Sequence, residues 1–178
     1  MPVVPDDKNW TWVLERTCPE CRFDTTTVGR DEVGPVLDEV VEAWDGVLDG
    51  RPEAALRQRP SEDRWSDLEY ACHVRDVFRL YDQRLELMLS QDDPLFPNWD
   101  QDATAVANRY SDQDPAEVAV ALSEAGQAIA SRFAGVTGGR WQRTGRRSDG
   151  ASFTVETFAR YFIHDPVHHL YDVTGQRR

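Results

Sequence analysis

The chain has 178 residues, enough for one domain with a full hydrophobic core. Hydrophobic residues make up 40% and charged residues 29% of it, a globular composition that excludes a disordered chain. The net charge of −12 repels phosphate backbones and anionic membranes, so we expect neither nucleic acid nor a membrane as a partner. The lack of a long apolar run, of a signal peptide and of an even cysteine count favours a reducing, cytoplasmic location.

Residues 1–30 carry no helical period and are expected to form an irregular N-terminal arm. The arm contains apolar side chains that would be costly to leave in water: Trp10, Trp12, Leu14 and Phe23. We therefore expect it to pack on the body of the protein, residues 31–178, within one chain or across a homodimer.

The arm also contains Cys18-Pro-Glu-Cys21, which has the spacing of half a zinc knuckle. A complete zinc site needs two further ligands, and the remaining cysteine, Cys72, is expected inside a helix. The pair is interpreted first as reduced structural cysteines. A redox pair and half of an intermolecular zinc site are the alternatives.

Apolar residues at spacings of three and four predict a first helix from about residue 31 to 48. A second helix is predicted from 66 to about 90. It opens with Ser66-Asp-Leu-Glu69, a capping box in which each of the two outer side chains bonds the other residue's backbone N–H.

Two more helices are predicted, over residues 114–133 and 154–173, and the first opens with Asp114-Pro. Between them, residues 141–152 are expected to form a small hairpin, near which all strand content is confined. The connection 91–113 is expected to be irregular and is long enough to return along a bundle. The pattern predicts an all-α four-helix bundle with one crossover, in which the second and third helices are parallel.

Three of the four histidines fall within six residues of the last predicted helix. His164 and His168 are four apart, so their imidazoles share one helix face and can bind one metal ion. A third nitrogen from His73, on a neighbouring helix, would leave an open position, as in catalytic metal sites. The plainer alternative is a polar helix end and a hydrogen-bonded core histidine.

The segments Trp65-Ser66 and Glu69–Asp76, with the His-x-x-x-His-His of the last helix, resemble the DinB/YfiT-like metalloproteins. The resemblance implies an up-down-down-up bundle with one divalent metal ion, most simply zinc or nickel, on His73, His164 and His168. His169 would then point away or support a ligand. The family includes mycothiol-dependent maleylpyruvate isomerases and bacillithiol- or mycothiol-dependent S-transferases.

Residues near the expected ligands bear on the geometry. Asp76 lies three after His73, where its carboxylate could fix an imidazole tautomer, and Asp165 and Asp172 invite the same interpretation. Pro166 removes one helical hydrogen bond and should bend the last helix, which leaves His169 as an alternative ligand.

Arginines precede the last helix and are interpreted as a solvated basic loop, with a clamp for a carboxylate-bearing substrate as the alternative: Arg143, Arg146 and Arg147.

These features predict a metal-dependent thiol S-transferase or isomerase. Its partners would be a small-molecule thiol and an electrophilic substrate, and the thiol would lose its proton at the metal. Water could take the same position, which makes a metal-dependent hydrolase an alternative. A further alternative is a metal- or ligand-binding bundle without turnover.

Overall fold

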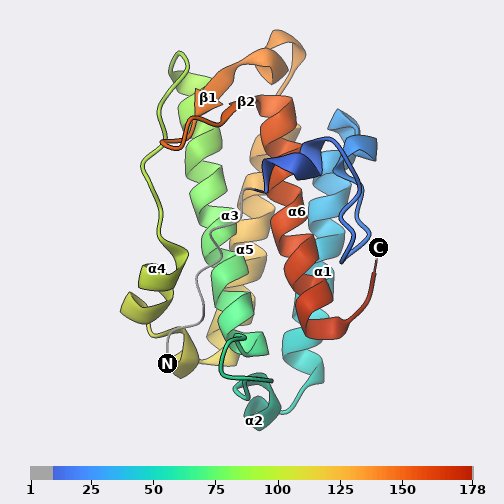
Figure 1. Cartoon of the computed structure of the whole chain (residues 1–178), viewed down its shortest axis with the longest axis vertical. Helices are drawn as coiled ribbons and strands as arrows, with labels where there is room; N and C mark the ends of the chain where they lie inside the picture. Colours follow the sequence, from blue (N-terminus) through green and yellow to red (C-terminus); the bar gives the residue numbers. More distant parts are fainter. Residues whose placement is uncertain (1–9, 178) are drawn as a thin grey trace.

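The computed structural model describes residues 10–177. Its body consists of four long helices: α1 (Val33–Gly50), α3 (Asp67–Ser90), α5 (Pro115–Ala134) and α6 (Val155–Thr174). Helices α3 and α5 run in one direction, and α1 and α6 run in the other (Figure 1). The predicted up-down-down-up bundle is confirmed.

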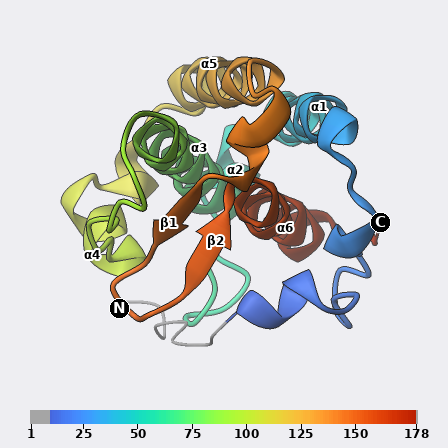
Figure 2. The same ribbon diagram turned by 90° about the horizontal axis from the view of Figure 1, so that it is seen from above.

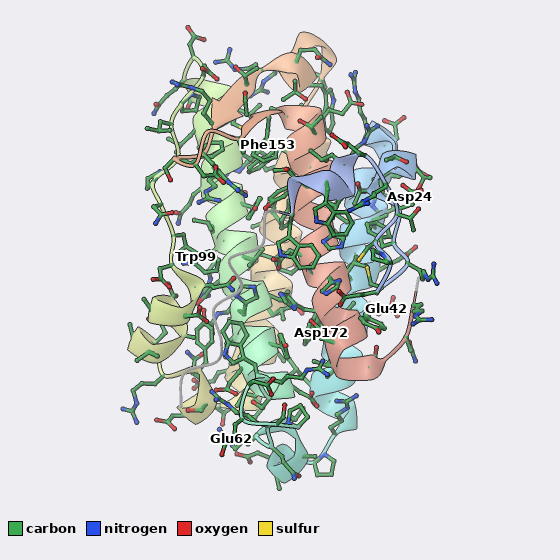
Figure 3. All side chains as sticks on the ribbon, viewed as in Figure 1. Asp24, Glu42, Glu62, Trp99, Phe153 and Asp172 are labelled. Carbon is green, nitrogen blue, oxygen red and sulfur yellow. The ribbon has the colours of Figure 1, made fainter. Side chains whose placement is uncertain are left out.

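The four helices form a ring around one core. Helix α5 packs against α1 and α3, and α6 packs against the other sides of α1 and α3 (Figure 2). Side chains of all four fill the space between them (Figure 3). No helix in the described part of the chain is long and apolar enough to cross a membrane.

Local sequence sets where the helices begin. The capping box at α3 is present: Ser66 Oγ accepts from the Glu69 N–H at 3.3 Å, and Glu69 Oε2 accepts from the Ser66 N–H at 2.9 Å. Asp114 caps α5, with Pro115 as its first residue. Thr154 caps α6 by accepting from the Thr157 N–H at 3.1 Å.

The connections carry short elements. Helix α2 (Glu53–Leu56) links α1 to α3, and the 3-10 helix η5 (Gly138–Gln142) follows α5. The hairpin pairs β1 (Thr144–Arg146) with β2 (Ser152–Thr154) in antiparallel register. The prediction that strands are confined to this region is confirmed for the described residues.

The crossover is more ordered than the sequence predicted. It contains α4 (Gln101–Ala107) and the 3-10 helix η4 (Tyr110–Asp112). Asp100 initiates α4 by accepting from the Ala103 N–H at 2.9 Å. A helix of two turns is too short to show a clear apolar period, which is why the pattern left it irregular.

The described part of the N-terminal arm, residues 10–30, lies against α6. It contains the 3-10 helices η1 (Thr11–Leu14), η2 (Thr25–Thr27) and η3 (Arg30–Glu32), of which η1 and η2 contact α6. Arg160 of α6 donates to the Val28 carbonyl at 3.0 Å. The first nine residues of the predicted arm lie outside the described residues.

Gly126 marks the closest approach of α5 to the core. A Cβ atom there would overlap Cγ2 of Val41 and lie 3.2 Å from Cε2 of Phe78. We expect Gly126→Ala to lower the free energy of unfolding by about 1–3 kcal/mol through overpacking. Urea unfolding followed by circular dichroism measures this.

The matched control is Gly46→Ala in α1, where a Cβ meets nothing within 4 Å. It should raise stability by about 0.5–1 kcal/mol, because alanine loses less backbone entropy than glycine on folding. Equal effects of the two substitutions would show that α5 does not pack this closely.

Candidate metal centres

Helix α6 presents two adjacent faces of metal-binding side chains. Residues four apart share a face of an α-helix, and neighbours are turned by about 100°. His164 and His168 therefore share one face, with ring centroids 5.1 Å apart. Asp165 and His169 share the next. The helix continues through Pro166, so both pairs keep this register.

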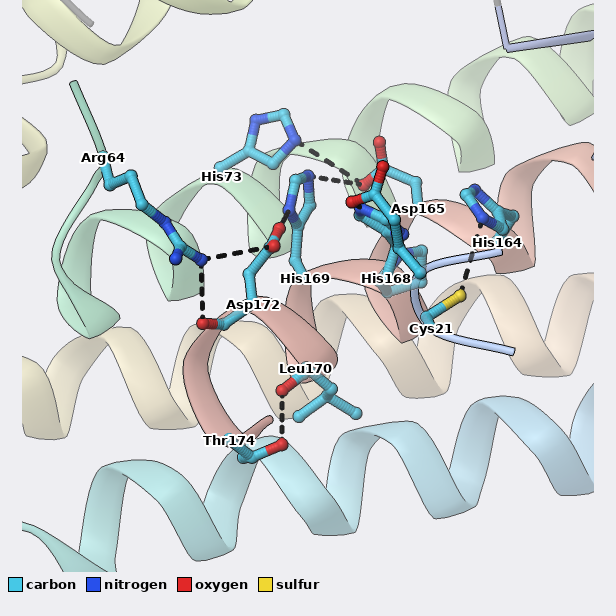
Figure 4. A network of polar contacts seen from close by, with 12 residues as sticks. Cys21, Arg64, His73, His164, Asp165, His168, His169, Leu170, Asp172 and Thr174 are labelled. Carbon is cyan, nitrogen blue, oxygen red and sulfur yellow. Dashed lines mark hydrogen bonds and ion pairs between the residues drawn. The ribbon is translucent and has the colours of Figure 1, made fainter. Parts of the chain in front are cut away.

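The first group, called the cleft site here, consists of His73, Asp165 and His169. His73 Nε2 lies 3.5 Å from Asp165 Oδ1, and His169 Nε2 lies 3.8 Å from the same oxygen. The three ligand atoms all lie within 4.8 Å of one another. Figure 4 shows both imidazoles directed at the Asp165 carboxylate.

The His73 side chain is fully buried in α3, and neither ring nitrogen has a hydrogen-bond partner among the residues that the structure describes. Within the same residues, Asp165 Oδ1 is buried without a hydrogen-bond partner as well. The rings of Trp65 and Trp99 flank the imidazole at 5.1 and 5.6 Å. Buried polar atoms are costly unless they bind something, so these atoms fit a metal ion.

A carboxylate supports the third member of the group. Asp172 Oδ2 lies 2.9 Å from His169 Nδ1, which leaves Nε2 of that ring directed at Asp165. Arg64 donates to the Asp172 carbonyl at 3.1 Å. Figure 3 shows Trp99 on the crossover and Asp172 on α6.

Both carboxylates are held ionised by the histidines. Burial alone would raise the pKa of Asp165, but His169 and His73 lower it to about 2. Burial likewise opposes ionisation of Asp172, and His169 shifts its pKa below the ordinary value.

A cavity of about 1060 Å³ opens beside the cleft site between α3 and α6. Its lining also includes Arg84 and Arg147, and from α6 it includes Tyr161, His164, Asp165, His168 and His169. Of the three arginines before α6, Arg147 lines the cavity and pairs with Asp149, whereas Arg143 and Arg146 pair with Asp92 and Asp93.

The second group, called the cysteine site here, consists of Cys18, Cys21, His164 and His168, whose ligand atoms also lie within 4.8 Å of one another. Cys18 Sγ is 3.7 Å from His168 Nδ1, and Cys21 Sγ is 3.7 Å from His164 Nε2 (Figure 4 shows the second contact). All four residues are buried.

Burial sets the protonation of this group. It raises the pKa of the Cys21 thiol to about 12, with Cys18 adding to the shift. Burial, with a contribution from His168, lowers the pKa of His164 to about 4. Burial also lowers the pKa of His168, so both imidazoles are neutral, the form that binds metals.

The structure divides the three histidines that the sequence placed together. His73 lies with Asp165 and His169, whereas His164 and His168 lie with the two cysteines. The reason is the rotation of α6 about its axis, which turns Asp165 and His169 toward α3 and leaves the pair of His164 and His168 on the neighbouring face. His169, expected to point away or to support a ligand, approaches Asp165 and His73 instead.

Asp76 does not support a histidine. Its carboxylate accepts from Arg75 Nε at 2.9 Å and from the Tyr110 hydroxyl at 2.6 Å. It therefore fixes η4 to α3, an interaction that depends on the fold of the crossover. Cys72 lies inside α3, as expected, and belongs to neither group.

From the sequence Asp165 was expected only to support a histidine, but its spacing also allows it to be a ligand. The segment from His164 to His169 contains two interleaved pairs at a spacing of four, one of two histidines and one of an aspartate and a histidine. Both pairs can bind a metal, and only the packing of α6 shows which of the two pairs lies opposite His73.

The comparisons with known proteins agree with this architecture. The sequence model of the DinB superfamily matches residues 37–173, and the chain belongs to this superfamily. A solved structure similar to this chain is YfiT from Bacillus subtilis, described as a probable metal-dependent hydrolase with an unusual four-helix bundle topology. It is 18% identical, with a TM-score of 0.77 over 82% of this chain and 84% of its own, so it supports the fold. No curated protein matches the chain.

Proposed function

We propose that this protein is a metal-dependent enzyme whose divalent ion is bound by His73, Asp165 and His169. The observation that carries the proposal is the convergence of three ligand atoms from two helices beside a large cavity. Two histidines and one carboxylate are a common ligand set of catalytic metals, because they leave positions open for substrate.

Charge favours an anionic ligand in those positions. Two neutral imidazoles and one carboxylate leave a divalent ion with one uncompensated positive charge in a partly buried site. A divalent ion held there would lower the pKa of a thiol or a water molecule and so supply a nucleophile at neutral pH.

The surrounding residues hold this arrangement in place. Asp172 fixes the tautomer of His169 by binding Nδ1, and Arg64 in turn contacts Asp172. Trp65 and Trp99 cover His73 and keep water from that side of the site.

The two arginines that line the cavity suit an anionic group of the substrate. Arg84 is buried, and its Nη2 donates to the Pro97 carbonyl at 3.2 Å, whereas its Nε has no hydrogen-bond partner among residues 10–177. Burial lowers the pKa of Arg84 from its ordinary value. Arg147 lies in the same wall and donates to the Tyr161 hydroxyl at 2.6 Å. A carboxylate bound here would satisfy Arg84.

The nucleophile we favour is a small-molecule thiol. The cavity of about 1060 Å³ exceeds the space that one small substrate needs and can hold a thiol and an electrophile together. The thiolate would form a carbon–sulfur bond while the leaving group departs with its electron pair, or an isomerisation would follow from reversible addition. Hydrolysis is the second candidate, because YfiT is described as a probable metal-dependent hydrolase.

Metal content of single and double variants tests the ligand set. His73→Ala and His169→Ala should each remove the same metal equivalent, so the double variant should lose no more than either single one. His164→Ala should leave that equivalent in place. If His73→Ala and His164→Ala instead remove one common equivalent, the ligands are the three histidines predicted from the sequence. Elemental analysis of protein purified without a His tag measures this.

Asp172→Asn should weaken metal binding at the cleft site by about 10–100-fold, because His169 loses the carboxylate that orients it. Competition with a fluorescent chelator measures the affinity. Asp63→Asn, which alters another acid that lines the cavity, is the control and should leave the affinity unchanged. An unchanged affinity in Asp172→Asn would remove His169 from the ligand set.

An activity screen tests the reaction. The metal-loaded protein is assayed with mycothiol, bacillithiol, glutathione or cysteine and a chlorinated nitroarene, and separately with nitrophenyl esters without thiol. We expect thiol-dependent turnover, lost in Asp165→Asn because the ligand set is broken and retained in the matched control Asp102→Asn. Ester hydrolysis without thiol would support the hydrolase, and a loaded protein without either activity would contradict the enzyme.

A carboxylate-bearing electrophile tests the role of Arg84 in the same assay. Arg84→Gln should raise KM for that electrophile and change KM little for its neutral analogue. Equal changes for both would exclude Arg84 as the anion-binding residue.

A further inference from the structure

We propose that Cys18, Cys21, His164 and His168 form a second metal site, a closed structural zinc site that fixes the N-terminal arm to α6. It lies outside the ligand set of the proposed enzyme and does not depend on that activity.

The spacing of the ligand atoms is that of a zinc tetrahedron. Bond lengths of about 2.3 Å to sulfur and 2.0–2.1 Å to nitrogen place a sulfur and a nitrogen roughly 3.6 Å apart in tetrahedral geometry. Both sulfur–nitrogen contacts in this group are 3.7 Å. Two such contacts side by side are expected of ligands that share one metal ion, whereas a hydrogen bond between a cysteine and a histidine would need only one.

The backbone around the cysteines is folded to bring both sulfurs to one side. The Arg22 N–H bonds the Cys18 carbonyl at 3.0 Å, and the Cys18 N–H bonds the Phe23 carbonyl at 3.0 Å. Arg22 has φ +67°, a left-handed conformation that is unfavourable for a residue other than glycine. Such a conformation persists when the surroundings require it, and a metal on the two sulfurs would supply that requirement.

The chemistry of the four ligands selects zinc and a structural role. Two thiolates balance the charge of a divalent zinc ion, so the site is neutral and can be buried at low cost. Cys18 and Cys21 are each 1% exposed, and His164 and His168 are 4% and 7% exposed. Four protein ligands leave no position for substrate, unlike the three of the cleft site.

A carboxylate supports one of these histidines as well. Glu20, between the two cysteines, places Oε2 3.6 Å from Nε2 of His168. The other ring nitrogen, Nδ1, faces Cys18. A carboxylate beside the nitrogen that does not bind the metal is the usual companion of a metal-bound histidine.

The site would shape the cavity of the proposed enzyme. Trp10 and Glu20 of the arm line that cavity, and Trp10 packs on the rings of His164 and His168 at 5.4 and 5.1 Å. Zinc would hold this wall against α6 without taking part in the reaction.

Cobalt substitution of the wild-type protein tests the site without any variant. Tetrahedral cobalt with two thiolates gives a thiolate-to-metal charge-transfer band in the near ultraviolet and intense visible bands. The cleft site has no sulfur ligand and gives no such charge-transfer band. We expect the charge-transfer band to appear and to be displaced by one equivalent of zinc. A cobalt-loaded protein without it would overturn the proposal.

Cysteine variants locate the site. Cys18→Ser and Cys21→Ser should each lose one zinc equivalent and the charge-transfer band, whereas the matched control Cys72→Ser should keep both. Far-UV circular dichroism of each variant checks that the bundle remains folded. Retention of the zinc and of the band in Cys18→Ser would overturn the site.

The two proposals fail separately. If Cys18→Ser loses the charge-transfer band but keeps the metal ion of the cleft site, the result supports the cysteine site whatever the enzyme assays show. Thiols of Cys18 and Cys21 that react fully with a thiol reagent in untreated protein, without release of zinc, would contradict it.

Discussion

The helical repeat of α6 is the constraint on which both candidate metal centres depend. Within six residues it directs two pairs of ligands to two faces, one toward α3 and one toward the arm. A rotation of α6 by one residue, about 100°, would turn Asp165 and His169 away from His73. Both pairs keep their places because the helix runs without interruption through Pro166.

The same repeat gives the two centres opposite electrical character. The cleft site combines one carboxylate with two imidazoles, and the cysteine site combines two thiols with two imidazoles. With a divalent ion, the first would keep a positive charge and the second would be neutral. One centre is thus suited to bind an anion, and the other to hold a segment in place.

The fold was largely predictable because its signals are local. The Ser66–Glu69 capping box and the Asp114-Pro start each act within one turn, and the structure begins helices at those positions. The length of the segment between α3 and α5 was enough to predict their parallel arrangement. Helix α4 was missed because two turns carry too little periodicity to be seen.

The site was less predictable because it depends on packing between distant segments. The sequence identified His73, His164, His168 and the cysteine pair, but not how they divide. The rotation of α6 about its axis decides that, and it is set by apolar contacts that a spacing rule does not contain. Asp76 illustrates the same point, since its partner Tyr110 is delivered by the crossover.

The contact between Cys18 and His168 joins residues 150 positions apart, so a bond there nearly closes the chain into a ring. Cross-linking a loop of more than 100 residues removes disorder from the unfolded chain worth roughly 5 kcal/mol in the simplest treatment. With zinc bound, the arm would be cross-linked to α6, so neither segment could unfold and move away from the other while the metal stayed in place. A pulling force applied to the arm and to the end of α6 would then pass through the zinc–ligand bonds, and the core helices α1, α3 and α5 between Cys21 and His164 would bear no load until those bonds broke.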